Sequence, residues 1–305
     1  MSNQPLVSVL MTAFNRSAFI ADAIASVLAS EYKNFELLVV DDCSTDNTVE
    51  IARQFESQDN RVKVFVNTKN LGDYNNRNKA ASYASGKYIK YLDSDDLIYR
   101  HSLLVMVDAM EKFPDAALGI STGQGQDEKP YPYILSSRGA YVKNFYDSGI
   151  FNTGPTGLII KTESFRAVNG FSGTRYVGDT ELNLRLAAAW PVVVVGPALI
   201  FWRVHEGQEF TAGVNGTGYL EVSMPMLERE LRRPNCPLTQ SEVEEVLTHY
   251  RKIYSRQLIN LALKKKRPAK AVKLGKQLSL KPLDVLRAVL LMKKGLSYKS
   301  AHRDL

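Results

Sequence analysis

The sequence predicts an α/β fold: a mostly parallel sheet with helices on both faces, followed by a helical C-terminal region. Through the first 120 residues, strand-like apolar runs alternate with helix-like segments. The strand-like runs are continuously apolar, as expected for parallel strands that are buried on both faces. Beyond about residue 220 only helical patterns remain. We therefore expect one domain over residues 1–219, with halves at 1–120 and 121–219, and a helical region over 220–305.

The first half repeats strand and helix in a regular order. Strands are expected over "LVSVLMTAF", "FELLVVDD", "RVKVFVN" and the apolar part of "KYIKYLDSDD". The helices expected between them are "SAFIADAIASVLAS", "STDNTVEIARQFES", which starts near Thr45 or Asp46, and "DYNNRNKAASYASG", which ends at Gly86. This order is typical of a doubly wound sheet.

The second half of the domain is less regular. Residues 121–157 are rich in Gly, Pro, Tyr and Ser and predict loops over a cleft. A strand and a helix are expected in "GLIIKTESFRAVNGF", a helix in "RYVGDTELNLRLAAAW" and a strand in "VVVVGPALIFWRVH".

Charge is distributed unevenly along the chain. Residues 251–305 carry 16 Lys or Arg and two acidic residues, a net charge of +14, whereas residues 1–250 carry a net charge of −7. The basic residues alternate with Leu, Val and Ala at near-helical spacing and with few aromatic residues, so we do not expect nucleic acid as a partner. Amphipathic helices on an anionic membrane surface, a helical hairpin packed on the body, and a homodimer formed through these helices all agree with this pattern.

No segment predicts secretion or membrane insertion. The N-terminus lacks the basic and apolar regions of a secretory signal, and the longest near-apolar run, at 190–202, is interrupted by Pro191 and Pro197. Two cysteines, Cys43 and Cys236, favour a reducing compartment. We expect a cytoplasmic protein, either free or peripheral on the cytoplasmic face of the membrane.

Polar residues follow three of the predicted strands. Asn15 and Arg16, the pair Asp41 and Asp42, and the segment 93–96 each lie at the carboxyl end of a strand. Ligands bind at this edge of a doubly wound sheet. No Gly-x-Gly-x-x-Gly follows the first strand and no Gly-x-x-x-x-Gly-Lys is present, so a dinucleotide site and a P-loop lose their main support.

The acidic segment "LDSDD" predicts a metal site. In an extended segment Asp93 and Asp95 point the same way, and Asp96 follows directly. Carboxylate oxygens suit Mg²⁺ or Mn²⁺, which complete their coordination with water and phosphate oxygens. The alternative is a structural loop in which Asp96 caps the next helix.

Four motifs in order resemble the family 2 glycosyltransferases of GT-A fold, which is a Rossmann-like architecture. They are "VSVLMTAFNRSAFIADAIASVL", "FELLVVDDCSTDNT", "NLGDYNNRNKA" and "GKYIKYLDSDDL". The resemblance covers residues 6–110 well and 150–210 more loosely. It implies a metal-dependent hexosyltransferase that acts with inversion on a nucleotide-diphosphate sugar, with uridine favoured, in bacterial-type surface polysaccharide assembly. The implied acceptor is a glycan or a lipid-linked sugar.

The resemblance also implies roles for individual residues. The implied donor-binding residues are Thr12, Ala13, Phe14, Asn15, Arg16, Asp41, Asp42, Arg77, Asp93, Ser94 and Asp95. Asp42 is favoured as the reader of the nucleobase, because a carboxylate complements the imino hydrogen of uracil. Thr12 and Phe14 depart from the family, which more often has Pro and Tyr in this turn.

The general base and a further metal ligand are expected in the second half. The family places its base in an acidic-Asp-x-x-Leu-x-x-Arg pattern, which implies Asp179 here, although Gly178 replaces the usual acidic residue. Glu181 is the substitute candidate for the base, and helix capping is the structural alternative for Asp179. His205 is implied as a metal ligand beside Asp93, Asp95 and Asp96, and Trp202 as a stacking surface for the acceptor.

Two other functions share parts of this pattern. A sugar nucleotidyltransferase also uses a metal and an α/β sheet, but we would expect a Gly-rich basic loop after its first strand, and "TAFNRSAF" contains no Gly. An inactive, membrane-associated scaffold of the same fold would lack a metal carboxylate, and none is missing here.

Overall fold

A computed structural model describes residues 4–121, 127, 129–206, 208, 217–278 and 280. The chain forms two compact units, one made of residues 1–140 and 150–205 and the other of 141–149 and 206–305. We describe each unit separately.

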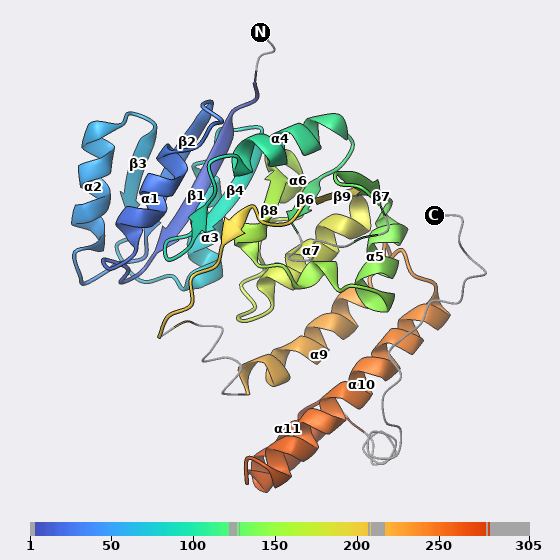
Figure 1. The fold of residues 1–305 in the computed structure, drawn as a ribbon. Helices are drawn as coiled ribbons and strands as arrows, with labels where there is room; N and C mark the ends of the chain where they lie inside the picture. The colour runs from blue at the N-terminus through green and yellow to red at the C-terminus, as the bar shows by residue number, and fades with distance from the viewer. Residues whose placement is uncertain are drawn as a thin grey trace. The chain divides into compact units, whose positions relative to one another are not determined.

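The first unit is built on an eight-stranded mixed sheet in the order β3-β2-β1-β4-β8-β6-β9-β7 (Figure 1). Its strands are β1 (Val7–Ala13), β2 (Phe35–Asp41), β3 (Val62–Val66), β4 (Tyr88–Asp93), β6 (Leu118–Ser121), β7 (Tyr133–Leu135), β8 (Leu158–Lys161) and β9 (Val192–Val195). The first four strands are all parallel, and β8 runs antiparallel to both of its neighbours. The expected α/β architecture is therefore confirmed.

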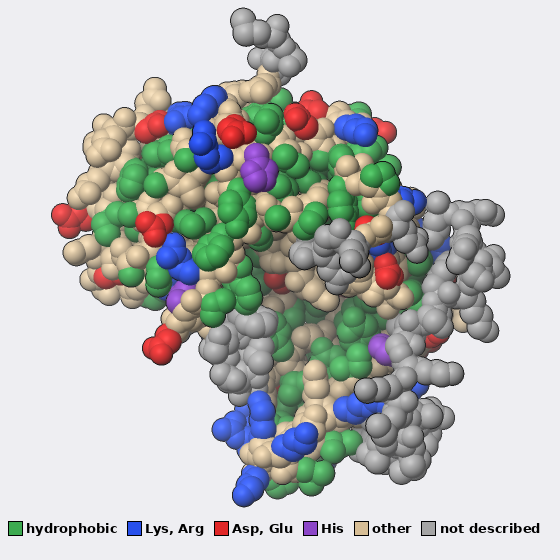
Figure 2. All heavy atoms as spheres, in the orientation of Figure 1, with side chains coloured by type: hydrophobic (Ala, Val, Ile, Leu, Met, Phe, Trp, Pro, Cys, Tyr) green, Lys and Arg blue, Asp and Glu red, His purple; other side chains and the backbone are tan. Residues whose placement is uncertain are grey.

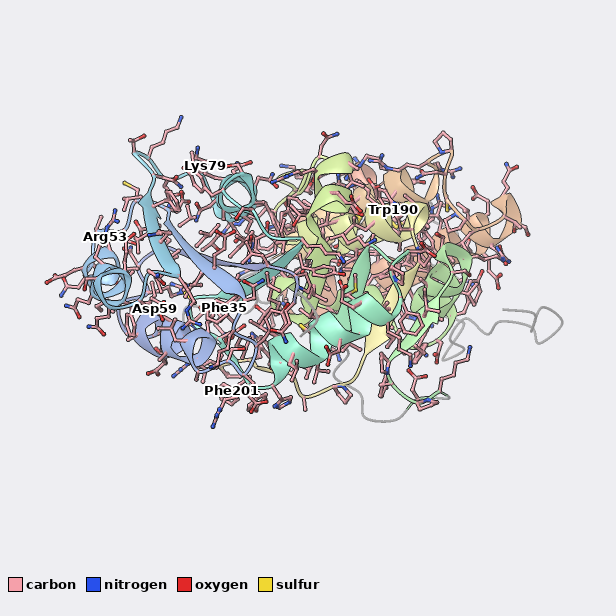
Figure 3. The ribbon with its side chains drawn as sticks, turned by 90° about the horizontal axis from the view of Figure 1, so that it is seen from above. Phe35, Arg53, Asp59, Lys79, Trp190 and Phe201 are labelled. Atoms are coloured by element: carbon pink, nitrogen blue, oxygen red, sulfur yellow. The ribbon has the colours of Figure 1, made fainter. Side chains whose placement is uncertain are left out.

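Helices cover both faces of the sheet. Those of the first unit are α1 (Ile20–Leu28), α2 (Thr48–Gln58), α3 (Asp73–Ser82), α4 (Ser102–Lys112), α6 (Thr162–Ala167) and α7 (Gly178–Ala189). Figure 3 shows α3, which carries Lys79, on the opposite side of the sheet from α1 and α4. Successive residues of β1 face opposite sides of the sheet. Val9 belongs to the apolar core that includes residues of α1 and α4, whereas Leu10 is buried but does not belong to that core.

The second unit is helical. It contains α9 (Gly218–Leu231), α10 (Gln240–Leu263) and α11 (Pro268–Gln277), together with the C-terminal part of α5 (Ser137–Tyr146). A capping box between Thr239 and Glu242 starts α10. The helices α10 and α11 share a small apolar core that includes Leu258 and Leu274.

Three local expectations were wrong. The segment 121–157 is not only loop, because it contains β7, α5 and two short 3₁₀ turns, η1 (Ile150–Asn152) and η2 (Pro155–Gly157). Helix α3 ends at Ser82, before Gly86, and a Cβ at Gly86 would lie 2.6 Å from the Ser8 nitrogen. Gly86 therefore permits a close backbone approach. Asp96 caps no helix, because the short strand β5 (Leu97–Ile98) follows it and α4 begins only at Ser102.

Candidate active site

The predicted polar clusters meet at one edge of the sheet. In the parallel register Ala13 lies opposite Asp41, and Thr12 lies opposite Asp93. The carboxyl ends of β1, β2 and β4 are therefore neighbours, so residues far apart in sequence line the same rim, as the sequence predicts.

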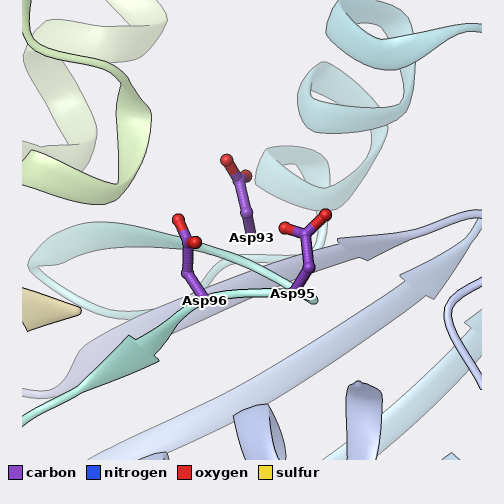
Figure 4. A group of neighbouring side chains, drawn as sticks. All are labelled: Asp93, Asp95 and Asp96. Atoms are coloured by element: carbon purple, nitrogen blue, oxygen red, sulfur yellow. The ribbon is translucent and has the colours of Figure 1, made fainter. Parts of the chain in front are cut away.

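The three aspartates converge through a turn. The main-chain N–H of Asp96 donates to the Asp93 carbonyl over 2.9 Å, which closes a turn over residues 93–96. One carboxylate oxygen from each of Asp93, Asp95 and Asp96 lies within 4.8 Å of the other two, and Figure 4 shows the three side chains together. The expected grouping is present, but the expected extended backbone is wrong, because the turn aims the side chains. Ser94 is buried within it.

Two arginines and a histidine face this acidic cluster. The Arg16 Nε lies 2.9 Å from the Asp95 Oδ2, and the His205 Nε2 lies 3.1 Å from the same oxygen. The Arg77 Nη2 lies 2.7 Å from the Asp93 Oδ1. Three residues predicted for the site therefore contact the cluster, and the two arginines offset part of the repulsion among its carboxylates.

Asp96 is the most buried member of the cluster. The Arg203 main-chain N–H donates to it over 3.0 Å, and the Thr156 hydroxyl donates over 3.3 Å. Burial, together with the neighbouring charge of Asp93, raises the pKa of Asp96 to about 7. Its ionised form is therefore costly unless a cation lies close by.

The two carboxylates after β2 are both engaged. Asp41 accepts the main-chain N–H of Ser44 over 2.8 Å and also the Ser44 hydroxyl. Asp42 accepts the main-chain N–H groups of Leu71 and Gly72 over 2.8 and 2.9 Å, and the Asn67 side chain over 2.9 Å. A carboxylate has about four acceptor positions, so these three hydrogen bonds use most of the capacity of Asp42, and two of them fix the start of α3. Its role in reading a nucleobase stays a prediction.

The turn after β1 is pinned to the turn after β2. Asn15 has a φ of 52°, in the left-handed region, and its side-chain oxygen accepts the Thr45 N–H over 2.9 Å. The Ser44 hydroxyl in turn accepts the Asn15 N–H over 2.8 Å. Phe14 remains exposed at this turn, with 44% of its surface accessible. An aromatic face is therefore available at the rim, where a base could stack.

Arg77 lies buried between carboxylates. Its Nε donates to Asp73 over 2.8 Å, and these two residues are one helical turn apart on α3. Burial would lower the pKa of Arg77, but Asp73 and Asp93 together raise it above its usual value, so it is a permanent cation. Its buried Nη1 has no hydrogen-bond partner within the described part of the chain. A buried donor of this kind fits an anionic or hydroxyl-bearing ligand.

Asp179 lies in the first turn of α7, where it is partly buried. Its Oδ1 accepts the Thr180 N–H over 2.7 Å, and its own N–H donates to the Tyr74 hydroxyl over 3.4 Å. Burial raises the pKa of Asp179 to about 6, and the charge of Arg77 partly opposes this effect. A carboxylate that titrates near neutral pH suits a general base.

Packing explains why Gly178 departs from the family pattern. A Cβ at this position would lie 2.7 Å from the ring of Tyr74, which fills the space that a side chain would need. Tyr74 therefore fills the space beside Gly178, and its hydroxyl accepts the Asp179 N–H.

The other acidic candidate on α7, Glu181, is engaged within the protein, and its role as a substitute base stays a prediction. Glu181 is almost fully buried and accepts a hydrogen bond from Ser172, while Arg185 donates to the carbonyls of Val168 and Gly170. Both residues fix the loop before α7.

Trp202, the predicted acceptor surface, is 52% exposed.

Sequence reasoning missed Lys90, Thr156 and Tyr74. Lys90 carried a signal, since it is the lone charge within the apolar run "YIKYL". Thr156 and Tyr74 carried none, because their roles depend on contacts across 63 and 105 residues of chain.

A known protein family matches the part of the chain that holds most of this site. The model of Glycosyl transferase family 2 matches residues 8–169, which is more than half of the chain and includes the whole acidic cluster. The chain belongs to this family. The protein is thus a glycosyltransferase, as its motifs predict.

Bacterial relatives share this assignment. The putative glycosyltransferase EpsE of Bacillus subtilis is 38% identical over 61% of this chain and 68% of its own length. The UDP-Glc:alpha-D-GlcNAc-diphosphoundecaprenol beta-1,3-glucosyltransferase WfgD of Escherichia coli is 41% identical over 35% of this chain. The glycosyltransferase described here spans only 42% of the length of WfgD.

Solved structures confirm the GT-A fold. S. aureus TarS 1–349 in complex with UDP-GlcNAc superimposes with a TM-score of 0.63 and 17% identity, over 92% of this chain and 79% of that one. The mannosyltransferase PcManGT from Pyrobaculum calidifontis, in complex with GDP-Man and Mn²⁺, gives a TM-score of 0.60 and 17% identity over 94% and 84%. No helix among the described residues combines the length and the hydrophobicity needed to span a membrane.

Proposed function

We propose that this glycosyltransferase moves a sugar from a uridine diphosphate donor to a glycan or lipid-linked acceptor, with inversion, in the assembly of a bacterial surface polysaccharide. The observation that carries the proposal is the convergence of Asp93, Asp95 and Asp96 with Arg16 and Arg77 at one edge of the sheet. A diphosphate is bound by cations and by hydrogen-bond donors, and this rim supplies both. The choice of donor is supported by two similar proteins, WfgD, which is described as a UDP-Glc glucosyltransferase, and TarS, which was solved with UDP-GlcNAc.

We assign the metal to the acidic cluster. The donor atoms available there are carboxylate oxygens, with the His205 nitrogen beside Asp95, and this set fits Mn²⁺ or Mg²⁺. Asp93, Asp95 and Asp96 would hold the ion, and His205 would be the further ligand. When bound, the ion would neutralise the charge that develops on the leaving diphosphate.

We assign the remaining donor contacts to the rim around the cluster. The residues are Thr12, Ala13, Phe14, Asn15, Arg16, Asp41, Asp42, Arg77 and Ser94. Phe14 offers an exposed ring for the base. The Arg77 Nη1, which has no hydrogen-bond partner among the described residues, offers a hydrogen bond to the sugar or the phosphate.

Asp179 is the proposed general base. The acceptor hydroxyl is a weak nucleophile, and a positioned carboxylate that removes its proton as the bond to the anomeric carbon forms contributes typically about 10²- to 10⁴-fold in rate. Asp179 suits this role because burial raises its pKa to about 6.

Release of nucleoside diphosphate from a panel of donor sugars tests the proposal. With an isolated lipid-linked acceptor fraction, we expect UDP release from one uridine-linked donor and its loss when EDTA removes divalent ions. Release of pyrophosphate instead would indicate a nucleotidyltransferase. Turnover that persists in EDTA would show that the transfer does not depend on a divalent ion.

We further propose that the tip of the α10–α11 hairpin holds the protein on the cytoplasmic face of an anionic membrane, where a lipid-linked acceptor is presented. Between residues 264 and 276 there are seven Lys or Arg and no acidic residue. Leu263 and Val272 are 74% and 59% exposed beside them. Figure 2 shows Lys and Arg side chains around this tip with hydrophobic side chains between them. This combination is typical of an interfacial helix.

A further inference from the structure

Lys90 is a buried lysine with no assigned role. It lies in the middle of β4, and its side chain has no exposed surface. Its Nζ donates to the main-chain carbonyl of Tyr91 over 3.1 Å and to that of Thr156. Burying an ammonium group costs several kcal/mol. The neighbouring strand residues are all buried and apolar or aromatic, so an aliphatic residue would avoid this cost.

Thr156 links Lys90 to the acidic cluster. It belongs to η2, which packs against β4. Its hydroxyl donates to the Asp96 Oδ2 over 3.3 Å and accepts the Asp93 N–H over 3.4 Å. Both distances are at the long end of the hydrogen-bond range, so a small shift of η2 would break them. Whatever holds the Thr156 main chain therefore also sets the position of two cluster aspartates.

We propose that Lys90 is a positioning residue: by holding the carbonyl of Thr156 it keeps η2 in place, and Thr156 then orients Asp93 and Asp96 toward a divalent ion. The inference rests on the metal site of the proposed function. It does not depend on the protonation state of Lys90, because a neutral amine also donates hydrogen bonds. Burial lowers the pKa of Lys90 to about 7, and Asp93 and Asp96 oppose that effect, which agrees with electrostatic proximity to the cluster.

The charge and the positioning effect of Lys90 have opposite consequences for ion binding. Removing a positive charge near three carboxylates would by itself tighten the binding of a cation. Removing the support of η2 would weaken it, and outer-shell contacts of this kind typically change metal affinity by about 10- to 100-fold. The direction of the change therefore separates the two effects.

The test measures Mn²⁺ affinity without donor, from the electron paramagnetic resonance signal of free Mn²⁺. We expect Lys90→Met and Thr156→Val each to weaken binding by about tenfold or more. The double variant should bind Mn²⁺ about as tightly as the single variant with the lower affinity, because both changes break the same chain of contacts. Thr156→Ser keeps the hydroxyl and should bind as wild type.

Lys161→Met is the matched control. Lys161 is also a largely buried strand lysine that donates to a main-chain carbonyl, that of Pro114, but it pairs with Tyr88 at the opposite end of β4. We expect unchanged Mn²⁺ affinity in this variant.

Three results would overturn the inference. They are unchanged or tighter binding in Lys90→Met, unchanged binding in Thr156→Val, and losses that multiply in the double variant. If Lys90→Met does not fold, Lys90→Gln takes its place, because it removes the charge and shortens the reach of the donor toward the Thr156 carbonyl. Unchanged or tighter Mn²⁺ binding in that variant would overturn the inference. A wild-type protein that binds no Mn²⁺ would instead refute the proposed metal site, and the inference with it.

Discussion

At the scale of single residues, Asp179, the proposed general base, carries a cost in stability. Its pKa is about 6 in the folded chain, above the usual value near 4 for an unfolded aspartate. The folded state therefore binds the proton more tightly. The stability that this group contributes is complete below about pH 4 and is lost as the pH rises through 6.

Replacing Asp179 with Asn should thus change stability and activity in opposite directions. We expect Asp179→Asn to have a higher melting temperature than wild type above pH 6, with the difference vanishing below about pH 4. Differential scanning fluorimetry at pH 4, 6 and 8 measures this. Wild-type kcat/KM should fall tenfold per pH unit below 6, because the base must be ionised. A melting-temperature difference that does not depend on pH would refute the raised pKa of Asp179.

Gly178 offers a test of packing next to the same residue. Gly178→Ala places a Cβ against the ring of Tyr74, and overpacking of this kind typically costs about 1–3 kcal/mol. Gly275→Ala in α11 is the control, because its Cβ would meet Leu258 at an ordinary 3.7 Å and helix propensity favours Ala by roughly 1 kcal/mol. Urea denaturation should show opposite signs for the two variants. Equal effects would mean that Tyr74 does not restrict this position.

At the scale of elements, periodicity predicted most strands and helices but not α5. The segment "SRGAYVKNFY" buries Tyr141, Val142 and Phe145, yet Gly, Pro and Ser surround it, so composition favoured a loop. The acidic turn was also beyond reach. Sequence showed that Asp93, Asp95 and Asp96 are close, but the i to i+3 hydrogen bond that aims them depends on tertiary context.

The α10–α11 hairpin gives a prediction at this scale. Replacing Leu263 and Val272 with Ser should reduce sedimentation with vesicles containing anionic phosphatidylglycerol, because both apolar contacts are lost. Changing Lys264, Lys265 and Lys266 to Gln should reduce it further, by about 1 kcal/mol per charge. Zwitterionic phosphatidylcholine vesicles are the control. Undiminished sedimentation of both variants would exclude this tip as the membrane contact, and a shift in mass by light scattering would favour a dimer.

At the scale of the whole molecule, the order of four motifs sufficed to predict the GT-A fold and the family. Parallel strands bring their carboxyl ends to one edge, so residues such as Asn15, Asp41 and Asp93 could be grouped before any coordinates. The sequence did not show which side chains lie against the three aspartates. Arg16, Arg77 and His205 contact the cluster directly, and Lys90 donates to the main-chain carbonyl of Thr156, through which we propose that it positions two of the aspartates.

The central claim is a division of labour between the cluster, which binds metal and donor, and Asp179, which removes the proton. The most direct measurement compares Mn²⁺-dependent UDP binding, by calorimetry, with sugar transfer in Asp179→Asn and Asp95→Asn. We expect Asp179→Asn to bind UDP within about threefold of wild type while transfer falls by about 10² or more, and Asp95→Asn to lose both. Wild-type turnover in Asp179→Asn, or loss of UDP binding in that variant, would contradict the account.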